Sequence, residues 1–229
     1  MKDISIFIQK HADVAHENLP DHYTLQVGGL YSHKDLKCDF SDVNGDNISA
    51  KNRTYVDLCG VYWIWKNVKD SKYVGNCHYS KYWNLTSSDA LDILKEHDII
   101  IPIAILPGRT VYQIFCDFHG AGPIDTARDI ISDLYPDYVK DFDDTIINDE
   151  ISTLYNMMIC SKDIWDSYCS WLFPILFELE NCYYIPEDAS GFDASVPGYI
   201  AERLLMVWIN HNKLDWVEGE IKRFCDKLK

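Results

Sequence analysis

Short runs of apolar, mostly β-branched or aromatic residues alternate along the chain with longer segments in which apolar residues recur every three or four positions. The short runs predict buried strands, and the longer segments predict amphipathic helices. Strands are predicted at residues 4–8, 73–77, 98–106 and 154–160. Because these strands alternate with helices, the pattern predicts an α/β fold.

Helices are predicted at residues 53–68, 88–97, 109–118, 124–134, 161–180 and 198–210, with a further turn or two at 137–145. Pro174 is expected to kink or divide the helix that contains it. Residues 22–50 are rich in Gly, Asp, Asn and Ser, which predicts turns that carry binding groups. The amphipathic tail, residues 213–229, predicts a terminal helix, and we favour packing on the domain over contact with a membrane surface. The length favours one domain over residues 1–229.

Two of the predicted strands end in titratable side chains. The strand at 73–77 runs into His78, Tyr79 and Lys81, and the first strand runs into Lys10 and His11. In open α/β sheets, ligands bind outside the carboxyl ends of the strands, so these clusters predict a site for a charged small molecule. A polar turn without a binding role is an equally open interpretation at this stage.

Glu202 and Arg203 are the charged residues in an otherwise apolar helical segment. Burying a charge costs several kcal/mol unless it is paired, so this dyad has either a structural or a catalytic role. The acidic run Asp141, Asp143 and Asp144 favours a solvated face over a metal site.

The composition narrows the class of partner. The net charge of −15 opposes binding to nucleic acid, although a nucleotide needs only a local positive site. The eight cysteines form no CxxC pair, and no long apolar segment resembles a signal peptide or a membrane span. These features predict a cytoplasmic protein with reduced thiols.

Seven blocks in order carry a resemblance to a known family. They are QVGGL at 26–30, GDNISAKN at 45–52, LCGVYWIWKN at 58–67, YVGNCHYSKYW at 73–83, TVYQIFCDFH at 110–119, LYNMMICSKDIWDSYCSWLFPILFELE at 154–180, and GYIAERLLMVWI at 198–209. Together they resemble bacterial glycosyltransferases of capsule and exopolysaccharide loci, a family long described only as a domain of unknown function. Ser80 and Lys81 depart from its pattern, which has two arginines there, so donor affinity or donor identity is in question.

The resemblance implies a GT-A-like nucleotide-sugar-binding domain with a mixed, mostly parallel central sheet, flanking helices and a helical C-terminal part. It implies transfer of a hexosyl unit, galactofuranose being one candidate, from a UDP-linked donor to a lipid-linked oligosaccharide, with inversion. Peripheral contact with the inner face of the cytoplasmic membrane would suit that acceptor. No Asp-x-Asp motif follows the strand at 73–77, so we favour a reaction without a required metal; manganese or magnesium held by His78 and carboxylates is the alternative.

The resemblance also implies roles for individual residues. Glu202 is the expected base, with Asp193 as the reserve candidate. Contacts to the nucleotide or diphosphate are expected from Lys10, His11, Gln26, Asp46, Asn47, His78, Tyr79, Lys81 and Arg203. Contacts to the sugar or acceptor are expected from Tyr155, Asn156 and His119.

Two other classes of function compete with transfer. One is a non-catalytic carbohydrate- or partner-binding protein on the same fold. The other is a metal-dependent hydrolase, which is disfavoured because the His and Asp spacings give no HExxH or similar motif.

Overall fold

The computed structural model describes residues 1–13, 18–32 and 34–223. Its main sheet has the strand order β10-β6-β9-β4-β1-β2-β3, with β5 and β11 attached beside β4. The strands are β1 Lys2–Lys10, β2 His22–Gln26, β3 Phe40–Ser41, β4 Ser71–His78, β5 Lys81–Trp83, β6 Ile99–Ile101, β9 Ile159–Ser161, β10 Trp216–Glu218 and β11 Ile221–Arg223. A separate ribbon pairs β7 Ile103–Ile105 with β8 Ile151–Thr153.

The helices are α1 Asn52–Tyr55, α2 Leu58–Asn67, α3 Ser87–Ile93, α4 Val111–His119, α5 Gly122–Leu134, α6 Val139–Phe142, α7 Lys162–Cys182 and α8 Val196–Asn212. Short 3-10 turns lie at η1 Ser49–Lys51, η2 Pro136–Tyr138 and η4 Gly191–Asp193, and a π-helical turn, η3, spans Asp143–Ile147. None of these helices, in the part of the chain that is described, is long and apolar enough to cross a membrane.

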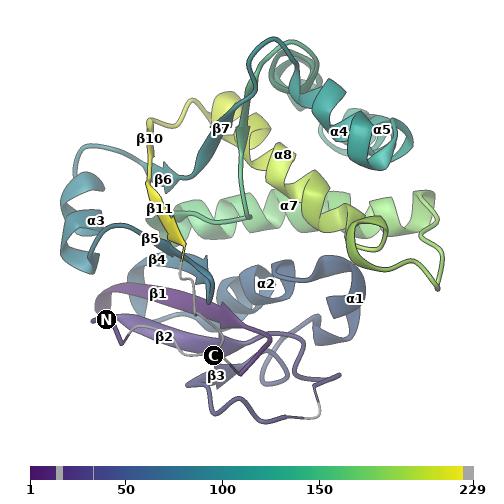
Figure 1. Cartoon of the computed structure of the whole chain (residues 1–229). Coiled ribbons are helices and arrows are strands. Elements are labelled where there is room, and N and C mark those ends of the chain that lie inside the picture. The colour runs from purple at the N-terminus through teal and green to yellow at the C-terminus, as the bar shows by residue number, and fades with distance from the viewer. Residues whose placement is uncertain (14–17, 33, 224–229) are drawn as a thin grey trace.

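The sheet is covered on both faces. Ile4, Ile6 and Ile8 of β1 pack with Ala90 of α3 in one core, and Phe7 of β1 belongs to a larger core with α2, α7 and α8. This division follows from the period of two along a strand, which sends successive side chains to opposite faces. Figure 1 shows α3 at the left of the sheet and α7 and α8 at its right. The predicted α/β fold is therefore confirmed, with a mixed sheet in which β4, β1, β2 and β3 are parallel.

Several predicted elements are interrupted in the structure. The predicted helix at 53–68 is divided into α1 and α2 at Val56, whose φ of 45° is not helical. The predicted strand at 98–106 becomes β6 and β7, because Pro102 has no N–H for the sheet and the chain turns away. The predicted strand at 154–160 is a turn followed by β9, since Tyr155 and Asn156 both have positive φ.

Two further predictions differ from the structure. Pro174 lies inside one continuous helix, α7, and does not divide it. The tail from 213 was expected to be helical, but residues 216–218 and 221–223 form the strands β10 and β11. β10 pairs with β6, and β11 pairs with β5. The remainder of that predicted helix, 224–229, lies outside the described residues. Pairing with a free strand edge thus overrides a helical pattern in a short segment.

Candidate active site

A hairpin at the carboxyl end of β4 places two cationic or titratable side chains beside each other. His78 is the last residue of β4, and Lys81, the first of β5, is its antiparallel partner. Because β1 runs parallel to β4 with Gln9 opposite His78, the ends of both strands open at the same edge of the sheet. This edge is where ligands bind in open α/β sheets.

A cavity of about 380 Å³ lies at this edge. Five residues predicted from the sequence line it: His78, Lys81, Tyr155, Asn156 and Glu202. The rest of its lining is Val56, Asp57, Phe192, Ser195, Gly198 and Tyr199. The structure therefore gathers side chains from the β4–β5 hairpin, the junction of α1 and α2, the 155–156 turn and the start of α8.

The 155–156 turn is held in an uncommon backbone conformation. Tyr155 has a φ of 65° and Asn156 a φ of 48°. The Tyr155 carbonyl accepts a hydrogen bond from Nε2 of His78 at 2.9 Å, and the Asn156 carbonyl accepts one from Nδ2 of Asn76 at 2.8 Å. Nδ2 of Asn156 donates to the carbonyl of Gly198 at 3.1 Å. Such strain persists where surrounding contacts enforce it, and it is frequent at functional sites.

Lys81 is the cation of the cavity. Its Nζ lies 4.6 Å from the centre of the Tyr155 ring, within the range of a cation–π contact. The pKa of His78 is lowered by burial and further by Lys81, despite the opposing effect of its bond to Tyr155. His78 is therefore mostly neutral at pH 7, and the positive charge beside it comes from Lys81.

Asp57, which was not predicted from the sequence, is a mostly buried carboxylate whose side chain is 14% exposed. Its Oδ2 is inaccessible, accepts no hydrogen bond and lies 3.8 Å from Nε2 of His78. Burial raises the pKa of Asp57 to about 6, although a hydrogen bond with Asn156 and the charge of Lys81 oppose the rise. An isolated aspartate between Val56 and Leu58 in an apolar segment was the available signal, the same one that marked Glu202.

Glu202 and Arg203 form a mostly buried ion pair; a structural pair and a catalytic role were the two interpretations left open by their place in an apolar helix. Nη1 of Arg203 donates to Oε2 of Glu202 at 2.7 Å, and their side chains are 12% and 14% exposed. Burial raises the pKa of Glu202, and the Arg203 charge partly offsets that rise. Glu202 thus has a carboxylate held by a cation, whereas Oδ2 of Asp57 is held by no donor.

His11 and Tyr79 lie next to the hairpin, outside the cavity lining. Their rings are 4.9 Å apart and nearly perpendicular, and the Tyr79 hydroxyl is 3.2 Å from Nε2 of His11. Burial lowers the pKa of His11, with contributions from His78 and Lys81. Lys10, one residue earlier, is only 4% exposed at the end of β1.

A second cavity, of about 490 Å³, contains the predicted residues His119 and Asp193. The segment 190–196 contributes residues to both cavities. The His119 ring lies 4.6 Å from the Tyr199 ring, and Phe192 stacks on Tyr199 at 5.3 Å. Nδ1 of His119 is buried without a hydrogen-bond partner, and burial together with Arg203 lowers the pKa of this histidine.

Gln26, Asp46 and Asn47, which were also predicted to contact the nucleotide, line neither of these cavities. The Gln26 amide holds the backbone of residues 34 and 36. Asp46 accepts a hydrogen bond from the Tyr62 hydroxyl, and Asn47 bonds within its own loop. The backbone N–H of Asp46 donates a hydrogen bond to Asn67, the last residue of α2. Asp57 lies at the other end of this helix, immediately before its first residue. The helix between them is about 15 Å long.

The described donor groups do not fit a divalent cation. No group of three His, Cys, Asp or Glu side chains in residues 1–13, 18–32 and 34–223 is arranged to hold one. In the first cavity, Nε2 of His78 donates to Tyr155, Glu202 is paired with Arg203, and Lys81 adds a positive charge. We therefore assign no chemical step to a metal.

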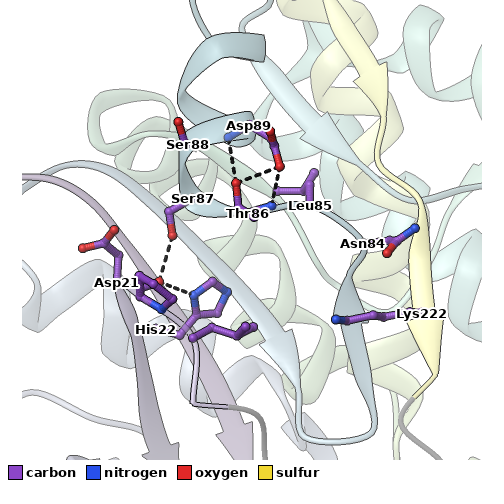
Figure 2. Close-up of a pocket in the computed structure, with 11 residues that line it drawn as sticks. Asp21, His22, Asn84, Leu85, Thr86, Ser87, Ser88, Asp89 and Lys222 are labelled. Atoms are coloured by element: carbon purple, nitrogen blue, oxygen red, sulfur yellow. Dashed lines mark hydrogen bonds between the residues drawn. The ribbon is translucent and has the colours of Figure 1, made fainter.

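Another cavity, of about 390 Å³, lies between the start of β2, the segment before α3, and β11 (Figure 2). Its polar groups serve the local structure: Ser87 Oγ donates to the Pro20 carbonyl at 2.9 Å, and Thr86 and Asp89 form the capping box of α3. It lies at the opposite strand ends from His78, because β2 begins here.

Comparisons with known proteins agree with this fold. A solved apo structure of WbbM, described as a bifunctional glycosyltransferase, superposes with a TM-score of 0.87 at 23% sequence identity. The match covers 98% of this chain and 46% of that chain, so this chain spans less than half of its length. No curated protein matches the sequence significantly. A family model described as Domain of unknown function (DUF4422) matches residues 5–213, and the chain belongs to that family.

Proposed function

We propose that the protein is a glycosyltransferase that takes its sugar from a nucleotide diphosphate, and that the reaction occurs in the cavity between His78 and Glu202. The fold, which is that of a solved glycosyltransferase, supports this proposal. The observation that carries it is the buried carboxylate of Asp57, which has an unpaired oxygen beside the cationic hairpin at the carboxyl edge of the sheet.

Asp57 suits the role of general base. A base needs a lone pair that is not already occupied and a pKa near the working pH. In the proposed step, Asp57 takes the proton of an acceptor hydroxyl while the hydroxyl oxygen attacks the anomeric carbon. The bond from that carbon to the diphosphate breaks, and its electron pair leaves with the diphosphate, whose charge Lys81 partly neutralises. This single displacement inverts the anomeric centre.

Glu202, the base predicted from the sequence, remains the alternative. Its pKa is also raised by burial, but the Arg203 guanidinium already occupies Oε2. We therefore propose that Glu202 orients groups around Asp57, and that substitution of each residue decides between them.

The second cavity suits the acceptor. His119 lines it, and its ring contacts that of Tyr199, which lines the first cavity and stacks on Phe192. Such rings form flat apolar contacts while leaving polar edges for hydroxyl groups. The unpaired Nδ1 of His119 would gain a partner from an acceptor hydroxyl. Asp193 lies at the same cavity. The finer identities rest on the sequence resemblance alone: a UDP-linked hexose such as galactofuranose, and a lipid-linked oligosaccharide acceptor reached at the membrane face.

The experiment combines binding and turnover. The wild-type protein should bind UDP, seen as a rise in melting temperature, and should slowly hydrolyse at least one nucleotide sugar. Asp57→Asn should lose hydrolysis and keep UDP binding, whereas Asp92→Asn, which changes an exposed carboxylate, should keep both. If Asp57→Asn retains turnover and Glu202→Gln loses it, the base is Glu202. If the wild type binds neither UDP nor GDP at millimolar nucleotide, the function proposed here is wrong.

A further inference from the structure

Two cations face each other directly across the pair formed by β5 and β11. The antiparallel register places Arg223 opposite Lys81, Lys222 opposite Tyr82, and Ile221 opposite Trp83. Directly opposed residues project to the same face, with Cβ atoms about 4.5–5.5 Å apart, and like charges in such a pair are destabilising. The chain thus keeps an unfavourable pair next to its candidate active site.

The overall charge makes this pair more informative. The chain has 21 basic and 36 acidic residues, so acidic partners for a lysine or arginine are plentiful. In the described part of the chain, however, the Arg223 guanidinium forms no hydrogen bond or ion pair, and the Lys81 ammonium contacts the Tyr155 ring. Two adjacent cations, neither of which forms an ion pair with a described residue, are a local positive site for an anion.

Tyr155 lies in the lining of two neighbouring cavities, one with each cation. It lines the cavity that contains Lys81, and it also lines a neighbouring cavity of about 420 Å³ that contains Arg223. Glu218 and Glu220 also line the cavity that contains Arg223, and Oε2 of Glu220 accepts a hydrogen bond from Asn84 at 2.8 Å. An anion at Tyr155 would therefore lie between Lys81 on one side and Arg223 on the other.

We infer that Arg223 and Lys81 together hold the diphosphate of the donor across the Tyr155 ring. This inference rests on the proposed glycosyltransferase function. An arginine presents a planar fork that binds two phosphate oxygens at once, whereas a lysine acts as a point charge. Arg223 thereby supplies the bidentate contact, and the bound diphosphate relieves the repulsion between the two cations.

The test compares neighbouring cations on opposite faces of β11. Lys222 lines the cavity of about 390 Å³ that Figure 2 shows, on the face of β11 opposite to Arg223. Lys222→Gln therefore removes one positive charge from β11 without changing the proposed site. The affinities of UDP, UMP and inorganic pyrophosphate are measured by calorimetry for wild type, Arg223→Gln, Arg223→Lys and Lys222→Gln. Circular dichroism confirms that each variant is folded.

We expect Arg223→Gln to weaken UDP and pyrophosphate by at least about tenfold, the loss typical of a hydrogen bond to a charged group. UMP should weaken by less than about threefold, Arg223→Lys should recover part of the loss, and Lys222→Gln should bind as wild type does. Equal UDP affinity in wild type and Arg223→Gln, or an equal loss in Lys222→Gln, overturns the inference and leaves the proposed function intact. Failure of the wild type to bind any nucleoside diphosphate overturns both.

Discussion

Oδ2 of Asp57 lies 3.8 Å from Nε2 of His78, yet that nitrogen donates its hydrogen bond to the Tyr155 carbonyl at 2.9 Å. The 155–156 turn, with its two positive φ angles, thus keeps His78 from satisfying Asp57. The carboxylate stays buried and partly unpaired, and its pKa is raised to about 6. The backbone conformation of the turn therefore helps to leave Oδ2 of Asp57 without a hydrogen bond.

The pH dependence of activity should report Asp57. Its carboxyl group must be ionised to accept a proton, so kcat/KM should fall about tenfold per pH unit below pH 6. Measurements from pH 4.5 to 8.5 should locate this acidic limb near 6. His78→Gln and Glu202→Gln, where they retain measurable turnover, should keep the same limb. A limb that disappears in either variant would assign the titration to that residue instead.

The stability of Asp57→Asn should depend on pH in a defined direction. The folded-state pKa of Asp57 is raised, so its protonation stabilises the native state below pH 4, and that contribution is lost as pH rises to about 6. Relative to wild type, Asp57→Asn should gain stability between pH 4 and 6, up to about 3 kcal/mol by pH 8. Urea unfolding at pH 4 and pH 8 measures the difference. A stability difference between the two proteins that is the same at pH 4 and pH 8 would contradict the raised pKa of Asp57.

Two glycines should respond oppositely to alanine. A Cβ at Gly60 of α2 would lie 2.7 Å from Cδ of the buried Gln9 side chain, so Gly60→Ala should destabilise the protein by about 1–3 kcal/mol. At Gly198 the nearest atom to such a Cβ is Oδ1 of Asp57, at 4.0 Å. Gly198→Ala should leave stability unchanged or raise it by up to about 1 kcal/mol. Because its methyl group narrows the cavity beside Asp57, turnover should decrease. Full activity in Gly198→Ala would place the reaction elsewhere.

Asn156 allows the strain of the turn to be separated from its hydrogen bond. Asn156→Gly loses the bond to the Gly198 carbonyl but adopts the φ of 48° readily, whereas Asn156→Ala loses the bond and retains the strain. Thermal unfolding should therefore rank wild type first, then Asn156→Gly, then Asn156→Ala. The two variants should differ by about 1 kcal/mol. An Asn156→Ala protein as stable as Asn156→Gly would show that the turn relaxes.

The sequence predicted elements well where one periodicity extends over many residues. Helices α4, α5, α7 and α8 lie within a few residues of their predicted bounds, and β1 and β4 are strands as expected. The misplaced elements depend on single backbone angles, as at Val56 and Tyr155, or on partners far away in the chain. The strands β10 and β11 exist because β6 and β5 offer them edges, which no local pattern reveals.

The candidate site was predicted in the same uneven way. The strand-end rule located His78 and Lys81, and an unexpected charge in an apolar helix located Glu202. Asp57 was missed because the predicted helix at 53–68 placed it within a regular element, whereas the structure places it at a break. Asp46 and Asn47 were expected at the nucleotide from the resemblance, which does not indicate the end of α2 at which their loop lies.

The most direct measurement is the release of nucleoside diphosphate from a panel of UDP- and GDP-sugars, with and without manganese, by wild type and Asp57→Asn. We predict release from at least one donor by the wild type, independent of manganese, and loss of that release in Asp57→Asn with nucleotide binding preserved. No release from any donor by the wild type, together with no binding of UDP or GDP, would contradict the account.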